Sequence, residues 1–296
     1  MAAQMQENPD QAALARTLAT IDRLSLNSHL NELETQGWTT IKGVLSQNTI
    51  ERAINALLDR VEKNTGKRID IETATEDDFG TMDYLPYMLY DDEVFEEVMM
   101  EEKPLAMISY LLGESCKLSS IGCHFKGMTE KGELPLHSDT SGPQPFSATS
   151  MVANVNYALT PYSKEAGALA MVPGSHKLAR QPMPVEMMLA GEHGNSQAVS
   201  QDLQPGDCVV WHGNAWHGSY PRQIPGIRMN LAVFFARHHI VTQERHKDVV
   251  PAEVLQRHAN DDRFRRLMAI DEAYGWSSPE GPDYAKMAQM PRGLYD

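Results

Sequence analysis

From about residue 116 the sequence changes into short strand-like runs separated by turn residues, and this succession constrains the fold more than any other feature. The runs are rich in β-branched and aromatic residues, and Gly-Pro and Pro-Gly pairs fall between them. They read KLSSIGCHF, TSMVANVNYAL, GALAMV, DCVVWH and RMNLAVFFA. Such a series favours a β-barrel or a β-sandwich core.

Helical patterns precede and follow this β-rich stretch. After Ser46, which can cap a first turn, apolar residues recur at helical spacing as far as Val61. A second helical stretch is expected over about 93–112, where Pro104 suits a first turn and Gly113 suits an end. We therefore expect one domain of the α+β class over residues 1–296, with a mainly helical lead-in over 1–115, a β core over 116–237 and a helical tail over 238–296.

Charge and apolar runs exclude several classes of partner. The net charge of −14 argues against nucleic acid and anionic membrane surfaces. No apolar run approaches the length of a membrane span, and the N-terminal stretch lacks the features of a secretory signal. The 3 cysteines show no zinc-type spacing and are expected to be reduced. We expect a cytoplasmic protein.

A candidate metal site lies in LPLHSDT, where His137 and Asp139 are two residues apart. In a strand this spacing directs an imidazole and a carboxylate to the same face, so that both can reach one ion. A third ligand would complete a facial triad, which suits non-haem iron(II) and leaves three coordination positions open. A second such pair, His246 and Asp248, is followed by no arginine that opens a strand, and we expect it to lie on the surface.

The third ligand and an anion-binding residue are both available in WHGNAWHGSYPRQIPGIRMNLAVFF. This stretch contains His212 and His217, and Arg228 begins its apolar strand. A 2-oxo acid can chelate iron through its carboxylate and keto oxygens, and its far carboxylate then needs a fixed cation. An arginine fork is suited to that carboxylate.

With these residues the sequence resembles the phytanoyl-CoA dioxygenase family of iron(II)- and 2-oxoglutarate-dependent oxygenases. The ordered matches are His137-x-Asp139, Gly167-Ala168-Leu169, Pro173-Gly174-Ser175-His176, Leu203-x-Pro205-Gly206-Asp207, His217-Gly218-Ser219 and Arg228. The resemblance implies a double-stranded β-helix, of the jelly-roll or cupin-like kind, with helices outside one sheet. It further implies that His137, Asp139 and His217 bind iron, that Arg228 and Ser219 hold the far carboxylate of 2-oxoglutarate, and that Asn156 is another co-substrate contact.

Most of the remaining candidate residues near the site are expected to have structural roles, and one has two possible positions. His212 and His217 are five residues apart, and His217 carries the family's Gly-Ser sequel, so we choose His217 as the ligand. His212 is expected to lie in the core or to orient its neighbours. Trp211 and Trp216 favour core positions over a substrate platform. His124 faces either the pocket or the core.

The function implied by the resemblance is a non-haem iron dioxygenase that uses 2-oxoglutarate and O2. Its default reaction is hydroxylation of an unactivated C–H bond in a small organic metabolite. From their composition and position in this sequence, the segments 64–92 and 177–200 are our candidates for the substrate walls and lid. The basic residues are scattered, so we do not expect an acyl-CoA substrate. The alternatives are a non-catalytic barrel and a metal-binding cupin-like barrel that works without 2-oxoglutarate. A small molecule is the expected partner, and a homodimer is left open.

Overall fold

The computed structural model describes residues 8–79, 84–128, 132–271, 276 and 279–296. Its strands are β1 (Trp38–Ile41), β2 (Tyr84–Leu85), β3 (Lys117–Lys126), β4 (Leu134–His137), β5 (Val152–Ala158), β6 (Leu169–Met171), β7 (Val199–Ser200), β8 (Cys208–His212), β9 (His217–Ser219) and β10 (Arg228–Ala236). Its α-helices are α1 (Pro9–Arg23), α2 (Asn27–Gln36), α3 (Gln47–Thr65), α4 (Glu93–Met99), α5 (Glu102–Leu112), α6 (His246–Val249), α7 (Ala252–Arg257), α8 (Asp262–Leu267) and α9 (Tyr284–Met287). Single 3-10 turns are η1 (Glu76–Phe79), η2 (Ser175–Leu178) and η3 (Pro184–Glu186).

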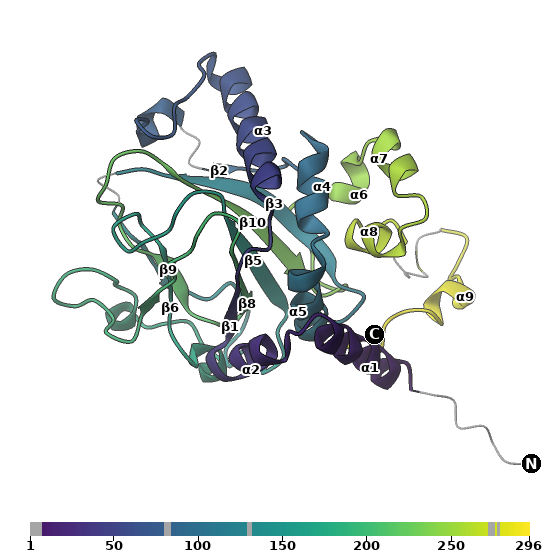
Figure 1. Cartoon of the computed structure of the whole chain (residues 1–296). Coiled ribbons are helices and arrows are strands. Elements are labelled where there is room, and N and C mark those ends of the chain that lie inside the picture. The colour runs from purple at the N-terminus through teal and green to yellow at the C-terminus, as the bar shows by residue number, and fades with distance from the viewer. Residues whose placement is uncertain (1–7, 80–83, 129–131, 272–275, 277–278) are drawn as a thin grey trace, which may run out of the picture.

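The strands form two antiparallel sheets. The large sheet has six strands in the order β1-β8-β5-β10-β3-β2, and the small sheet has four in the order β4-β9-β6-β7. Helices α3, α4 and α5 lie on one side of the large sheet, and β6 and β9 lie on the other (Figure 1). The predicted α+β class with a mainly β core and flanking helices is therefore confirmed.

Alternation along the strands gives the large sheet two different faces. On β5, Ala153, Val155 and Tyr157 belong to the main apolar core, which also contains side chains of α3, α4 and α5. Asn154 and Asn156 point to the opposite face, where they line a cavity. Because every residue of β5 is buried, polar side chains on alternate positions indicate a polar interior on that face.

Both predicted helical stretches are helical in the structure, but the second consists of two helices. The side chain of Ser46 accepts a hydrogen bond of 3.1 Å from the backbone N–H of Thr49, so α3 begins where the cap was predicted. The stretch 93–112 divides into α4 and α5, and α5 ends at Leu112 and is capped by Gly113, which has φ of 86°. Among the described residues, no helix has both the length and the apolar character needed to cross a membrane.

Candidate metal centre and its cavity

Three side chains from the small sheet and its adjoining loop converge in the interior. His137 ends β4, Asp139 follows in the next turn, and His217 begins β9. One ligand atom from each lies within 4.8 Å of the others, and His217 Nε2 is 3.6 Å from Asp139 Oδ1. Gly218 lets β4 and β9 approach closely, because a Cβ there would lie 2.4 Å from the Leu134 carbonyl oxygen.

Backbone hydrogen bonds orient both imidazoles toward the same point. His137 Nδ1 lies 2.9 Å from the Pro135 carbonyl oxygen, and His217 Nδ1 lies 3.1 Å from that of Ala215. A carbonyl only accepts, so each Nδ1 carries a proton and each Nε2 has a free lone pair in the neutral ring. Burial lowers the pKa of His217, which favours that neutral, ligating form.

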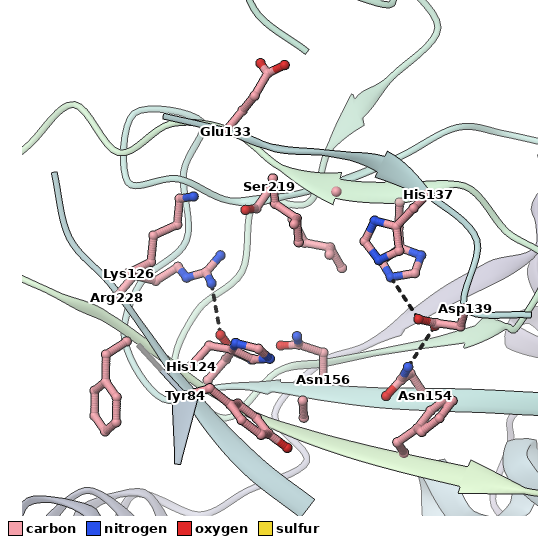
Figure 2. A pocket seen from close by; sticks show the side chains of 18 of the residues that line it. Tyr84, His124, Lys126, Glu133, His137, Asp139, Asn154, Asn156, Ser219 and Arg228 are labelled. Atoms are coloured by element: carbon pink, nitrogen blue, oxygen red, sulfur yellow. Dashed lines mark hydrogen bonds and ion pairs between the residues drawn. The ribbon is translucent and has the colours of Figure 1, made fainter. Parts of the chain in front are cut away.

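Asp139 is held by two donors from the large sheet. Asn154 Nδ2 donates to Asp139 Oδ2 at 2.8 Å, and Trp211 Nε1 donates to the same oxygen at 2.9 Å. Figure 2 shows Asn154 and His137 on opposite sides of the Asp139 carboxylate. The prediction that Trp211 lies in the core holds for its ring, but its N–H reaches the candidate metal centre, which sequence reasoning missed.

The loop that carries Asp139 is tied to the loop that precedes His217. Ser138 Oγ donates to the Gly213 carbonyl at 2.9 Å, and Thr140 Oγ1 donates to Asn214 Oδ1 at 2.7 Å. Gln181, which belongs to neither loop, adds three bonds. Its side-chain amide donates to the carbonyls of residues 138 and 140, and its side-chain oxygen accepts from the backbone N–H of Ser138. These bonds fix the relative position of two segments that carry candidate ligands and are distant in sequence.

Arg228, on β10, is a buried cation with unused donor capacity. Its side chain donates to the Gly167 carbonyl at 2.6 Å and to Asn230 Oδ1 at 3.0 Å, and its guanidinium lies 4.6 Å from the Tyr162 ring centre. Its Nε and the Asn230 Nδ2 are buried without a hydrogen-bond partner. No described carboxylate forms an ion pair with it, so the arrangement suits an added anion.

Lys126 is a second cation beside Arg228. The two residues are direct partners across β3 and β10. Burial, followed by the positive charge of Arg228, lowers the pKa of Lys126 to about 8. Its stem passes over Gly167, where a Cβ would lie 3.0 Å from Lys126 Cδ and Cε.

The other two predicted co-substrate contacts line the same cavity. Ser219, on β9, is buried, and in the view of Figure 2 it lies between the two cations and His137. Asn156 Oδ1 accepts a hydrogen bond of 3.2 Å from Tyr162 Oη, which leaves the amide N–H groups of Asn156 as the donors available to the cavity. The structure therefore brings together all six predicted site residues.

The cavity measures about 530 Å³, and the segment 64–92 forms part of its wall through Glu76 and Tyr84. The Tyr84 ring lies over Gly122, where a Cβ would be 2.2 Å from the tyrosine oxygen, and it packs 4.5 Å from the His124 ring. His124 is thus a cavity residue. None of the described residues in 177–200 lines this cavity.

Two other histidines lie apart from the candidate metal centre. His212 Nε2 is 3.3 Å from the Ala148 carbonyl oxygen, and its Nδ1 accepts from the backbone N–H of Asn214 at 3.0 Å, as expected for a core residue. The prediction of a surface pair at His246 and Asp248 is wrong for His246, whereas Asp248 is exposed as expected. His246 is 3% exposed, and its Nε2 lies 2.9 Å from buried Glu244.

Comparison with known proteins gives a family match over most of the chain. The sequence model of the family described as phytanoyl-CoA dioxygenase (PhyH) matches residues 33–230. Dioxygenase af480 of Aspergillus fumigatus is 27% identical over 209 residues, which is 68% of this chain and 62% of the relative. Dioxygenase cdmD of Talaromyces verruculosus is 29% identical over 103 residues, which is 35% of this chain and 31% of that protein. The chain thus covers less than two thirds of each of these relatives.

Solved structures show a similar fold at low identity. HygX from Streptomyces hygroscopicus, with nickel and 2-oxoglutarate bound, superposes with a TM-score of 0.55 at 17% identity, covering 77% of this chain and 92% of HygX. The non-heme alpha ketoglutarate dependent epimerase SnoN from nogalamycin biosynthesis gives a TM-score of 0.52 at 18% identity, covering 73% and 84%. At these identities the likeness concerns the fold alone.

Proposed function

Since the chain belongs to the phytanoyl-CoA dioxygenase family, we propose that it is an iron(II)- and 2-oxoglutarate-dependent oxygenase acting on a small organic molecule. The observation that carries the proposal is one cavity that holds both a His-Asp-His cluster and a buried arginine without a carboxylate partner among the described residues. Neither feature alone would be sufficient, because metal clusters and buried arginines both occur for other reasons. Together they match the requirements of a metal and a chelating dianion.

His137, Asp139 and His217 would hold the iron. Two neutral imidazoles and one carboxylate are the donor set expected for non-haem iron(II), and three coordination positions remain for small ligands. When bound, iron(II) with 2-oxoglutarate supplies the activation of O2 that oxidises an unactivated C–H bond, while the co-substrate leaves as succinate and CO2. The protein's part is to hold and orient these groups and to exclude water.

Arg228 and Ser219 would bind the far carboxylate of 2-oxoglutarate, and Asn156 would donate to another of its oxygens. The fit rests on chemistry present in the chain, since 2-oxoglutarate offers only acceptors. The free Arg228 Nε and Asn230 Nδ2 are both donors. Hydrogen bonds to Gly167 and Asn230 keep the guanidinium in place before any ligand arrives.

The two facing sheets would form a double-stranded β-helix within a single domain over residues 1–296. The family match and the structural neighbours support this reading, as does the location of the cavity between residues of both sheets. In this arrangement the small sheet supplies two metal ligands, and the large sheet supplies the co-substrate cation. Hydroxylation is the default outcome.

The substrate would be a small molecule and not an acyl-CoA. The described cavity cations, Lys126 and Arg228, lie together at one end of the cavity (Figure 2). A coenzyme A moiety would need further basic residues for its phosphates, and the chain carries a net charge of −14. Tyr84 and His124, on the wall beside the site, would contact the substrate.

The proposal is tested by measuring succinate from 2-oxoglutarate with iron(II), ascorbate and O2, with and without a panel of small metabolites. We expect slow succinate formation alone and faster formation with a substrate. Both should be lost in His217→Ala. Iron binding without any succinate formation would contradict the proposal and favour a 2-oxoglutarate-independent metal protein.

A further inference from the structure

We propose that Trp211 and Asn154 are positioning residues that restrict Asp139 to binding the metal through one oxygen, Oδ1. The inference rests on the proposed function, because it concerns the geometry of the iron site. It goes beyond that function by assigning a role to two residues that belong neither to the triad nor to the co-substrate site. Both residues come from the large sheet, whereas Asp139 follows β4 of the small sheet.

The hydrogen bonds around Asp139 are unequal. Oδ2 accepts from Trp211 Nε1 at 2.9 Å and from Asn154 Nδ2 at 2.8 Å, whereas Oδ1 faces His217 Nε2 at 3.6 Å. A carboxylate oxygen has two lone-pair directions, so two N–H donors satisfy Oδ2 fully. Oδ1 is then the oxygen left for a metal ion.

The two donors are themselves held in place. Trp211 is 3% exposed and packs in an apolar cluster with Trp38 and Leu169. Its ring centre lies 4.8 Å from that of His217. Trp211 therefore contacts two of the three candidate ligands, Asp139 and His217. Asn154 is 7% exposed on the middle of β5, and its amide must present Nδ2 to Asp139 because the carboxylate only accepts.

The chemical consequence is the number of open metal positions. One imidazole from each histidine and one oxygen from Asp139 would hold three of the six positions of a bound metal, and three would remain for small ligands such as the chelating co-substrate. If Asp139 rotated to bind through both oxygens, it would fill a fourth position. Trp211 and Asn154 oppose this rotation, because it would remove an oxygen from two buried donors.

The chain provides a matched control in Trp216. This side chain is 2% exposed, and its indole N–H donates at 2.8 Å to the Arg180 backbone carbonyl, which is no part of the triad. Trp211→Phe and Trp216→Phe therefore remove the same chemical group from equally buried rings. Only the first variant changes the surroundings of Asp139.

The experiment uses cobalt(II), added anaerobically to the purified full chain, as a spectroscopic substitute for iron(II). Affinity is measured by calorimetry, and coordination by visible absorption of the cobalt complex. We expect Trp211→Phe and Asn154→Leu each to weaken cobalt binding about 10-fold or more and to change the absorption bands. Trp216→Phe should alter neither quantity.

The possible outcomes separate this inference from the proposed function. If Trp211→Phe and Asn154→Leu are folded by circular dichroism and keep the native affinity and spectrum, the positioning role is overturned. Equal losses in Trp211→Phe and Trp216→Phe would also overturn it, since they would indicate general loosening. If Trp211→Phe does not fold, Asn154→Leu carries the test. A native chain that binds cobalt no better than His217→Ala would overturn the metal site itself.

Discussion

The carbonyl oxygen of Gly167 accepts a hydrogen bond of 2.6 Å from Nη1 of Arg228, and the absent side chain of the same glycine leaves space for Lys126. Gly167 has φ of 79°, a conformation that favours glycine. One residue thus orients the proposed co-substrate cation with its backbone and makes room for a second cation by its lack of a Cβ.

Gly167→Ala is therefore expected to reduce both stability and co-substrate binding. Left-handed backbone costs a non-glycine residue about 1–2 kcal/mol, and the contact with Lys126 and the Tyr220 carbonyl should add about 1 kcal/mol or more. Gly174→Ala is the control, because Gly174 has φ of 74° but a Cβ there would meet no atom within 4 Å. Urea unfolding and 2-oxoglutarate titration would check this, and equal effects of the two substitutions would contradict it.

Arg228→Ala should weaken 2-oxoglutarate binding without loss of the metal. Leaving one charge of a buried pair without its partner costs about 2–5 kcal/mol, which corresponds to a roughly 30-fold or greater loss of affinity. Arg228→Lys keeps the positive charge but not the paired N–H donors of the guanidinium, and we expect an intermediate loss of 2-oxoglutarate affinity. The measurement is anaerobic titration of the iron-loaded protein with 2-oxoglutarate, followed by the absorption of the chelate. An unchanged affinity in Arg228→Ala would refute the assignment.

His217→Ala should lose the metal, whereas His212→Ala should keep it. His217 Nε2 faces Asp139, but both nitrogens of His212 are engaged by the backbone of Ala148 and Asn214. Metal content after anaerobic loading, with circular dichroism as a check on folding, distinguishes the two. A folded, fully metallated His217→Ala beside a metal-free His212→Ala would show that the wrong histidine was chosen.

His212 should also make the protein less stable in acid. Burial, followed by the charges of His176 and Arg237, lowers the pKa of His212 to about 4, below the ordinary value of 6.5. Between these values the unfolded chain binds a proton that the folded chain does not, so stability falls as the pH falls from about 6.5 to about 4. The free energy of unfolding lost over the whole window is about 3 kcal/mol. As the pH falls through this window, the free energy of unfolding of the native protein should fall relative to that of His212→Gln, as measured with urea. Parallel pH profiles would contradict the prediction.

The sequence was most informative where a pattern extends over many residues. The long strands β3, β5, β8 and β10 and the amphipathic helix α3 were predicted, because alternation and helical spacing accumulate along them. Strands β4 and β9 were not predicted from periodicity, since they have 4 and 3 residues and form through pairing with each other. The site residues on them were identified from the two-residue spacing of His137 and Asp139 and from the order of the family's motifs.

Long-range contacts account for what the sequence did not indicate. Trp211 lies 72 positions from Asp139, and nothing local predicts their hydrogen bond. A weak signal existed for Asn154, because an asparagine between the apolar residues of a buried strand needs a polar partner. His246 was misjudged because Tyr87, Tyr90 and Glu244 surround it, and two of these come from a distant segment.

The bonds between the Asp139 loop and residues 213 and 214 bear on how this scaffold can diversify. They hold the candidate metal ligands in one rigid group, whereas Tyr84 reaches the cavity from the separate segment 64–92 and rests on Gly122. Mutations in that segment can therefore reshape the space for a substrate and leave the proposed metal centre unaltered. In the proposed oxygenase, natural selection could in this way change which molecule is oxidised without first losing the capacity to oxidise.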